Sequence, residues 1–249
     1  MKIYIGIDLH GTLLNKQEKI TESFQKALYA SLKKLKAKAK LFVCTGNDLP
    51  FVKEVIPQHI FSLFDGCVLE TGCVVSDGAK EVVKVPAKIQ DLSQKLRKKL
   101  ENRFPETEFR RRLTTISLFC SNPKNFAKNV EDFVNKSRYI EDFDVTYSSV
   151  AVDVIPKGWD KFIGMKMIAG KNKIIGIADS MNDFGLLERS HFSFIPSNAP
   201  PEIINKLQEN GKRVVNITKT GLDQELVIQA NHPDVEGVIE ILNFLSKRL

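Results

Sequence analysis

The sequence predicts an α/β fold in which a doubly wound, mostly parallel sheet carries a small inserted α+β domain. Apolar runs typical of buried strands alternate with segments of helical spacing toward both ends of the chain, and the middle breaks that alternation. Strands that alternate with helices build a parallel, Rossmann-like sheet. Ligands of such a sheet bind at the carboxyl ends of its strands.

The N-terminal part begins with a strand over residues 2–9, which ends in a Gly-Thr turn. Residues 20–36 have apolar side chains at helical spacing and a lysine-rich outer face, with Thr21 as the expected N-cap. A second buried strand follows at 39–45, and Asp48 starts another helix. This order is the beginning of a strand–helix–strand core.

The rest of the core is expected on both sides of the middle segment. Residues 64–85 indicate strands and turns punctuated by glycines. Residues 173–178 and 192–195 indicate buried strands, each followed by a helix. We expect the last strand at 214–217 and a closing helix at 235–245.

The middle of the chain predicts a self-contained α+β block, which begins with a basic amphipathic helix at 89–104. A strand at 113–120, a helix at 125–135 and a long strand or hairpin at 145–155 follow. Removing the block leaves two halves that can join into one sheet. The expected division is a core of 1–82 and 157–249 and an inserted cap of 83–156.

The composition is that of an ordinary globular protein, because the 249-residue chain is 43% hydrophobic and 27% charged. Its net charge of +7 fits an anionic ligand and equally fits a plain solvated surface. No aromatic stacking platform accompanies the basic residues, which argues against nucleic-acid binding. The four cysteines form no C-x-x-C pair, which argues against a zinc site and indicates reduced thiols. With no apolar stretch that spans a bilayer and no signal-peptide core, we expect a cytoplasmic protein.

Four polar signals follow apolar strands and carry the chemistry. They are Asp8-Leu9-His10-Gly11-Thr12, Thr45-Gly46, the Lys161 of Pro156-Lys157-Gly158-Trp159-Asp160-Lys161, and Asp179-Ser180-Met181-Asn182-Asp183. Strand ends of a doubly wound sheet converge on one crevice, so these groups can meet despite their distance in sequence. Taken singly each is an ordinary cap, turn or solvated lysine.

Together these residue types fit phosphoryl transfer. A carboxylate can attack phosphorus and form an aspartyl-phosphate. Carboxylates from two strand ends make a hard oxygen site suited to Mg²⁺. A hydroxyl and backbone N–H groups at Thr45-Gly46 can hold phosphate oxygens, and a lysine can offset the charge on the transferred group.

The order D-x-x-G-T, T-G, P-K-G-x-x-K and D-S-x-N-D resembles the haloacid dehalogenase superfamily (HAD) of phosphohydrolases. The single insertion resembles the C2-type cap of its Cof-like and sucrose-phosphatase-like branch. Glu70-Thr71-Gly72, Ser197-Asn198-Ala199 and Glu236-Gly237-Val238 are similar to further motifs of that branch. The resemblance covers nearly the whole chain.

The resemblance implies a role for each matching position. Asp8 is implied as nucleophile and metal ligand, His10 as a ligand through its backbone carbonyl, and Asp179 and Asp183 as metal ligands. Thr45 and Lys161 are implied as phosphate-binding catalytic residues, and Lys157 is the competing lysine. Gly46, Asn47, Asn182 and Asn198 are the implied substrate-binding or supporting residues.

One position departs from the family's pattern, because His10 stands where its phosphatases and phosphomutases carry a second aspartate. That aspartate is the family's general acid and base, and losing such a group costs about 10²–10⁴-fold in rate. Three alternatives stay open: His10 acts as the acid–base group, the enzyme is slow and limited to easy leaving groups, or the site binds phosphate without useful turnover. Asn47 also departs from the pattern, since an arginine often follows T-G.

The substrate is expected to be a small phosphorylated metabolite, as the cap type implies. If residues 110–112 form a strand, Arg110 and Arg112 share one face and can bind an anionic part of the substrate. The plainer alternative, which we prefer at this point, is a solvated arginine run. The leading hypothesis is therefore a Mg²⁺-dependent phosphatase. A phosphomutase of the phosphomannomutase type and a catalytically weak phosphate-binding protein are its alternatives, and the sequence leaves the oligomeric state undetermined.

Overall fold

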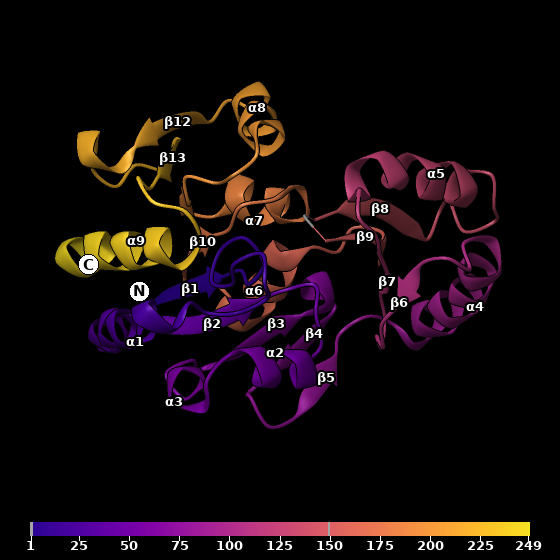
Figure 1. Ribbon diagram of the computed structural model, residues 1–249, viewed down its shortest axis with the longest axis horizontal. Helices are drawn as coiled ribbons and strands as arrows, with labels where there is room; N and C mark the ends of the chain where they lie inside the picture. Colours follow the sequence, from indigo (N-terminus) through magenta and orange to yellow (C-terminus); the bar gives the residue numbers. More distant parts are fainter. Residues whose placement is uncertain (1, 149) are drawn as a thin grey trace.

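The computed structural model describes residues 2–148 and 150–249, which fold into two sheets with their helices (Figure 1). Met1, the first residue of the predicted core, and Ser149, inside the predicted strand or hairpin at 145–155, lie outside the described residues. The larger sheet forms the core, and the smaller one lies at the end of the molecule away from both termini. The predicted mixed α/β fold with a cap is confirmed.

The core sheet is parallel over most of its width. Its order is β12-β13-β11-β10-β1-β2-β3-β4-β5, and every neighbouring pair from β12 to β3 is parallel. The last two pairs are antiparallel and form a meander at one edge. The strands are β1 (Ile3–Ile7), β2 (Lys40–Cys44), β3 (Gly66–Leu69), β4 (Val74–Ser76), β5 (Glu81–Val83), β10 (Lys173–Ile177), β11 (Phe192–Ile195), β12 (Arg213–Asn216) and β13 (Leu226–Gln229).

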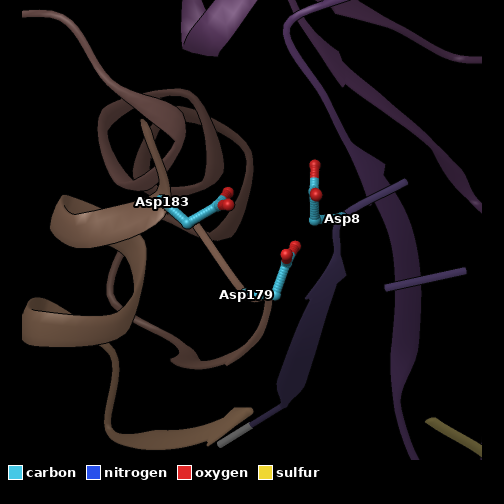
Figure 2. Close-up of side chains that lie close together, drawn as sticks. All are labelled: Asp8, Asp179 and Asp183. Atoms are coloured by element: carbon cyan, nitrogen blue, oxygen red, sulfur yellow. The ribbon is translucent and has the colours of Figure 1, made fainter. Parts of the chain in front are cut away.

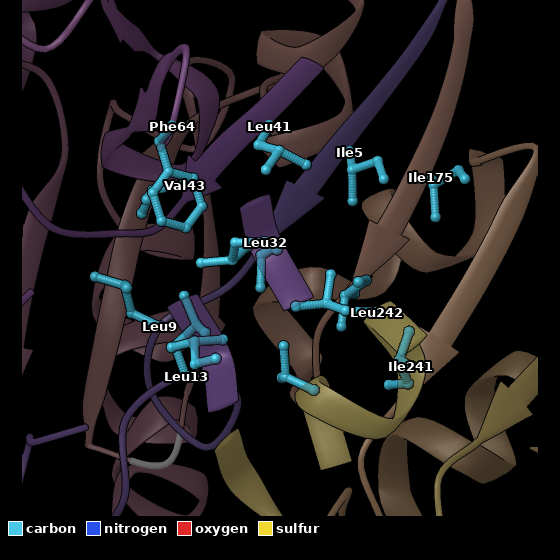
Figure 3. Close-up of a cluster of buried hydrophobic side chains, with 14 of the residues drawn as sticks. Ile5, Leu9, Leu13, Leu32, Leu41, Val43, Phe64, Ile175, Ile241 and Leu242 are labelled. Carbon is cyan, nitrogen blue, oxygen red and sulfur yellow. The ribbon is translucent and has the colours of Figure 1, made fainter. Parts of the chain in front are cut away.

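Helices cover both faces of the core sheet. One face packs against α1 (Glu22–Lys36) and α9 (Asp234–Arg248), and Figure 3 shows Ile5, Leu32 and Leu242 meeting there. The other face packs against α6 (Lys161–Ala169), α7 (Phe184–Arg189) and α8 (Pro201–Glu209). The short helices α2 (Leu49–Val55) and α3 (Gln58–Phe61) follow β2. Burial on both faces explains why these strands are nearly continuous apolar runs.

The cap is an antiparallel sheet of order β6-β7-β9-β8, with two helices on one face. Alternation assigns the faces, since Ile116, Leu118, Val152 and Val154 pack with the helices in a separate apolar cluster. The intervening residues face the core. The cap elements are α4 (Ala87–Arg103), β6 (Glu108–Phe109), β7 (Ile116–Phe119), α5 (Pro123–Asn135), β8 (Phe143–Tyr147) and β9 (Ala151–Pro156). The domain boundaries given above stay a prediction.

Three local expectations are wrong. The strand at 213–216 is not the last, because β13 follows it and inserts between β12 and β11. Residues 110–112 are not a strand, because β6 ends at Phe109 and the next strand begins at Ile116. Thr21 precedes α1 but makes no capping bond with its side chain. Among the described residues, no helix is both long and apolar enough to cross a membrane.

Candidate active site

Three aspartates meet at the carboxyl ends of two adjacent strands. β1 and β10 are parallel with Ile7 opposite Ile177, so the residues just beyond them, Asp8 and Asp179, come side by side. Asp183 reaches the same point from the 3₁₀ turn Met181–Asp183. Carboxylate oxygens of the three lie within 4.8 Å of one another and are buried (Figure 2). The structure thus brings together the acidic residues that the sequence assigned to the metal.

Lys161 holds two of these carboxylates together. Its side chain is 1% exposed, and Nζ lies 2.6 Å from Asp8 Oδ1 and 2.5 Å from Asp183 Oδ1. The lysine reaches this point because it is the first residue of α6. The start of α6 lies close to the backbone of Gly72, since a Cβ added to Gly72 would lie 2.0 Å from the Asp160 carbonyl oxygen. Burial alone lowers the pKa of Lys161, but the charges of Asp183 and Asp8 raise it overall, so the amine stays protonated.

The carboxylates carry more negative charge than Lys161 offsets. Burial, with the charge of Asp183 next, raises the pKa of Asp8 to about 7. Burial followed by the charges of Asp8 and Asp183 also raises the pKa of Asp179. Three ionised carboxylates and one ammonium leave two negative charges in a buried site. A bound divalent cation would neutralise them. The hard oxygen donors match Mg²⁺ in kind, so the residues present fit this ion.

The loop after Asp8 is shaped around Asp179. Gly11 adopts a φ of +73°, and a Cβ on it would lie 2.2 Å from Asp179 Oδ2. Thr12 donates a hydrogen bond from Oγ1 to Asp179 Oδ1 at 3.0 Å. The G-T that follows the nucleophile position therefore has two separate tasks, since glycine leaves room for the carboxylate and threonine orients it.

Thr45, Gly46 and Asn47 form the second side of the site. Thr45 follows β2, and its Oγ1 accepts hydrogen bonds from the backbone N–H and the side-chain Nδ2 of Asn47, both at 3.2 Å. With its acceptor side occupied, the Thr45 hydroxyl is free to donate into the cavity that it lines. Asn47 accepts a hydrogen bond from Arg112 Nη2 at 2.6 Å, so it links the core to the cap.

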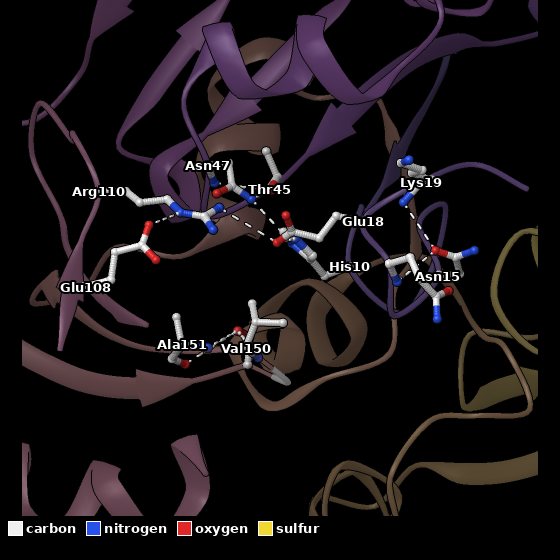
Figure 4. A network of polar contacts seen from close by, with 12 residues as sticks. His10, Asn15, Glu18, Lys19, Thr45, Asn47, Glu108, Arg110, Val150 and Ala151 are labelled. Atoms are coloured by element: carbon white, nitrogen blue, oxygen red, sulfur yellow. Dashed lines mark hydrogen bonds and ion pairs between the residues drawn. The ribbon is translucent and has the colours of Figure 1, made fainter. Parts of the chain in front are cut away.

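His10 is held by protein groups at both ring nitrogens. Nε2 lies 3.1 Å from Glu18 Oε1, and Nδ1 lies 3.4 Å from Asn47 Nδ2 (Figure 4). The amide donates to Nδ1, so the neutral tautomer that fits both contacts carries its proton on Nε2. The ring stacks against Phe51 with centroids 5.5 Å apart. Burial is the largest effect on the pKa of His10 and lowers it, although Glu18 acts in the opposite direction.

Arg110 and Arg112 lie in the segment that joins β6 to β7, and Arg110, which was expected to bind substrate, is outside the cavity lining. Arg112 lines the cavity, and Arg110 Nη1 lies 3.7 Å from Glu18 Oε1, with its guanidinium 4.0 Å from the centroid of the Phe119 ring. The preferred expectation of a solvated arginine run is wrong for these two residues. The segment is not a strand, so strand alternation does not place the two arginines on one side. Each makes its own contact with the core instead.

Glu70 joins this cap segment to the core. From the sequence it was recognised only as part of the motif Glu70-Thr71-Gly72. The carboxylate is 0% exposed and accepts hydrogen bonds from the backbone N–H of Leu113, Thr114 and Thr115 and from Thr114 Oγ1. Glu70 itself has a φ of +47°. The four bonds position the chain just beyond Arg112.

Asp153 is a cavity residue that the sequence reasoning missed. It lies on β9 opposite Ser117 of β7, and both side chains point away from the apolar side of the cap. Ser117 Oγ donates to Asp153 Oδ1 at 2.6 Å, while a Cβ placed on Gly46 would lie 3.7 Å from Asp153 Oδ2. The available signal was one acidic residue inside the otherwise apolar run Ala-Val-Asp-Val-Ile-Pro. Glu18 left no such signal.

The remaining predicted residues divide between the cavity and its surroundings. Asn182 lines the cavity and accepts a hydrogen bond from Ser180 Oγ at 2.7 Å. Asn198 was expected to bind substrate, but it lies outside the lining and donates to the Gly11 carbonyl oxygen at 2.8 Å. Lys157, the competing lysine, is exposed and donates to the Ile140 carbonyl oxygen. Lys161 is therefore the lysine of the site.

The cavity lies between the carboxyl ends of the core strands and the cap sheet. The core contributes Asp8, His10, Thr45, Gly46, Asn47, Ser180 and Asn182, and the cap contributes Arg112, Ser117, Phe119, Ser148, Val150, Ala151 and Asp153. The empty space between these side chains is about 340 Å³ and opens to solvent.

Comparisons with known proteins agree with this architecture. The sequence model of the haloacid dehalogenase-like hydrolases matches residues 5–92 and 85–212. A search of curated proteins gave no match. Similar solved structures include a Streptococcus mutans protein (TM-score 0.73, 15% identity, 99% of each chain covered) and a Thermoplasma acidophilum protein (TM-score 0.70, 16% identity, 100% of each chain covered). The sucrose-phosphatase from Synechocystis, solved with sucrose and phosphate, is similar with a TM-score of 0.67, 16% identity and coverage of 97% of this chain and 96% of that one.

Proposed function

The chain belongs to the haloacid dehalogenase-like hydrolases, and we propose that it is a Mg²⁺-dependent phosphatase that forms an aspartyl-phosphate on Asp8. The observation that carries this proposal is the buried cluster of Asp8, Asp179 and Asp183 with Lys161 bound between two of them. Carboxylates so close together repel one another, and folding tolerates them where a cation binds. The substrate we propose is a small phosphorylated metabolite.

The residues that would hold the metal are Asp8, Asp179, Asp183 and the backbone carbonyl of His10. When bound, Mg²⁺ supplies positive charge that lets an anionic carboxylate approach an anionic phosphate. Lys161 contributes to the same end from the protein side, because its ammonium already contacts Asp8. Thr12 and Gly11 keep the Asp179 carboxylate in place beside it.

The transferred phosphoryl group would lie against Thr45 and Gly46. The Thr45 hydroxyl, which accepts from Asn47, is free to donate toward the cavity that it lines together with Gly46. Asp8 then attacks phosphorus, and the covalent intermediate separates the departure of the alcohol from the attack of water. Each step is easier than direct hydrolysis because the nucleophile is already positioned.

The cap would recognise the remainder of the substrate. Among the residues that the structure describes, the buried Nε–H of Arg112 has no hydrogen-bond acceptor. A guanidinium edge that lines the cavity favours a carboxylate or a second phosphate on the substrate. Asn182, on the core side, offers an amide to the same space. Phosphoglycolate and phosphoglycerate derivatives carry such a carboxylate, whereas sugar phosphates, the other substrates we propose, would offer hydroxyl groups to the cap.

His10 decides how strong the activity is. Both ring nitrogens of His10 are engaged. The alternative to an efficient phosphatase is therefore a slow phosphatase or a catalytically weak phosphate-binding protein. A phosphomutase would transfer the phosphoryl group to a second position of a sugar instead of releasing phosphate. A cytoplasmic location and the lack of a nucleic-acid partner also belong to this proposal.

The test is a panel of phosphorylated metabolites assayed for phosphate release with the wild type, Asp8→Asn and His10→Asp, each with Mg²⁺ and with a chelator. We expect release by the wild type that needs Mg²⁺ and is lost in Asp8→Asn. Equal release by wild type and Asp8→Asn would sink the proposed mechanism. A large gain in His10→Asp would identify the histidine as an impairment, and a large loss would identify it as the acid–base group.

A further inference from the structure

On the core side of the cavity, the described residues outside the proposed metal ligands offer the departing alcohol no acidic side chain with a proton to give. His10 occupies the family's acid–base position, but Nε2 is engaged by Glu18 and Nδ1 by Asn47. Because both ring nitrogens are in use, the imidazole directs no proton at a substrate. Lys161 is committed to Asp8 and Asp183.

The leaving oxygen departs toward the cap. In an in-line displacement, the attacking and leaving oxygens lie on opposite sides of phosphorus. Asp8 attacks from the end of β1, so the leaving group points to the face of the cap sheet that covers the cavity. That face carries Ser117, Phe119, Ala151 and Asp153. Among the described residues that line the cavity on the cap side, Asp153 has the one carboxyl group.

Resting on the function proposed above, we propose that Asp153 is the catalytic acid that protonates the leaving oxygen and then the base that activates water. Its two oxygens are already distinguished, because Ser117 donates to Oδ1 while Oδ2 faces Gly46, where the phosphoryl group would bind. The proton therefore belongs on Oδ2. The side chain is 4% exposed, so bulk water does not compete for it.

The surroundings of Asp153 shift its pKa upward. Burial is the largest effect on the pKa of Asp153 and raises it, against the opposing effects of Ser117, Arg112, Lys161 and Asn182. A bound phosphate adds negative charge beside the carboxyl and raises that pKa further. An ionised Asp153 would repel the substrate at this position, whereas the acid form donates to it.

The proton balance closes over the two steps. First, the bond from Asp8 to phosphorus forms, the bond from phosphorus to the leaving oxygen breaks, and that oxygen takes the proton from Asp153 Oδ2. The alcohol, the aspartyl-phosphate and an Asp153 carboxylate result. Second, water gives a proton to Asp153 as its oxygen attacks phosphorus, and the bond to Asp8 breaks. Phosphate leaves, and both aspartates return to their starting forms.

The experiment compares phenyl phosphate with p-nitrophenyl phosphate, two substrates of similar shape whose leaving groups differ in acidity. Asp153→Asn and Asp153→Ser are assayed beside the wild type, with Asp144→Asn, an exposed aspartate of the neighbouring strand β8, as a matched control. Phenolate is the poorer leaving group and needs the acid. We therefore expect kcat/KM, which reports the step that releases the alcohol, to fall about 10²-fold or more for phenyl phosphate in both Asp153 variants and to change little for p-nitrophenyl phosphate. The kcat values fall for both substrates, because hydrolysis of the aspartyl-phosphate loses its base.

The second substrate also reports folding, because turnover of p-nitrophenyl phosphate requires an intact site. An equal fall in kcat/KM for both substrates would overturn the inference and assign Asp153 a structural or binding role, and so would an unchanged kcat/KM for phenyl phosphate. Asp8→Asn run in parallel separates the two proposals. Loss of both activities in Asp8→Asn supports the phosphatase whatever Asp153 does, and retained activity removes the basis of both.

Discussion

On the core side of the cavity, the charged groups bind one another. On the cap side, the segment that carries Arg112 is held by hydrogen bonds to the core. Asp8, Asp183 and Lys161 form a buried ion cluster at the ends of parallel strands. The cap segment is fixed by Glu70 and by the contact between Arg112 and Asn47. The comparison indicates that the core assembles the reaction centre from its own side chains, while the cap contributes further side chains to the same cavity through its contacts with the core.

The largest effect is expected when the core cluster loses the ammonium of Lys161. Lys161→Met leaves Asp8 and Asp183 buried without their shared partner, which typically costs about 3–5 kcal/mol of stability. The same change removes charge stabilisation from the transferred group, worth about 10²–10³-fold in kcat. Thermal unfolding and kcat measure the two losses. Lys157→Met, an exposed lysine of the same segment, is the control, and equal effects of both changes would contradict the assigned difference.

A smaller effect is expected at the joint between core and cap. Glu70→Gln removes the charge that strengthens four hydrogen bonds to residues 113–115, each worth about 1.5–3 kcal/mol when one partner is charged. We expect faster amide hydrogen exchange at 113–115 and a raised KM, with Asp8 chemistry retained. Unchanged exchange in this segment would show that Glu70 does not hold the cap.

The next effect sharpens the cap's part in recognition. Arg112→Lys keeps the charge but loses the flat guanidinium edge, so KM is expected to rise about 10-fold for substrates with a second anionic group. Substrates without that group are expected to change little, and kcat to stay near the wild-type value. Steady-state kinetics on paired substrates decides this, with exposed Arg111→Lys as control. A uniform rise for all substrates points to lost packing instead.

The last prediction concerns pH and metal. The pKa of Asp8 is raised by burial to about 7 in the folded, metal-free protein, compared with about 4 for a free aspartate. The folded state thus holds a proton that the unfolded chain has already lost, so the stability present below pH about 4 declines as the pH rises toward 7. Thermal melts with a chelator should show this decline, and saturating Mg²⁺ or Asp8→Asn should reduce it. A metal-free protein that gains stability over this range would contradict it.

The sequence predicted the core side of the site better than the cap side, for a physical reason. Asp8 and Asp179 directly follow buried apolar strands, and parallel strands place such residues together, so local pattern and position agree. Asp153 lies within a strand, and only the pairing of β9 with β7 shows that it faces the core. Glu18 belongs to a loop without periodicity. Its contact with His10 depends on tertiary structure.

The local errors have the same origin. β13 is a four-residue run, too short for periodicity to separate a strand from a loop. Arg110 and Arg112 lie on one side of their segment, as predicted, but the strand geometry behind that prediction is absent. Instead, Arg110 contacts Glu18 and Arg112 contacts Asn47. Long-range contacts of single side chains therefore limited the prediction, while the parallel sheet and its strand ends followed from apolar runs.

The most direct test of the central claim is to find where the phosphoryl group resides during turnover. Wild-type protein with Mg²⁺ and a hydrolysed substrate is quenched, digested and examined by mass spectrometry for phosphorylated peptides. The account predicts phosphate on the peptide that contains Asp8, at its carboxylate, and none in Asp8→Asn. Phosphate on His10, or turnover without any phosphorylated peptide in a quench shown to preserve acyl phosphates, would contradict it.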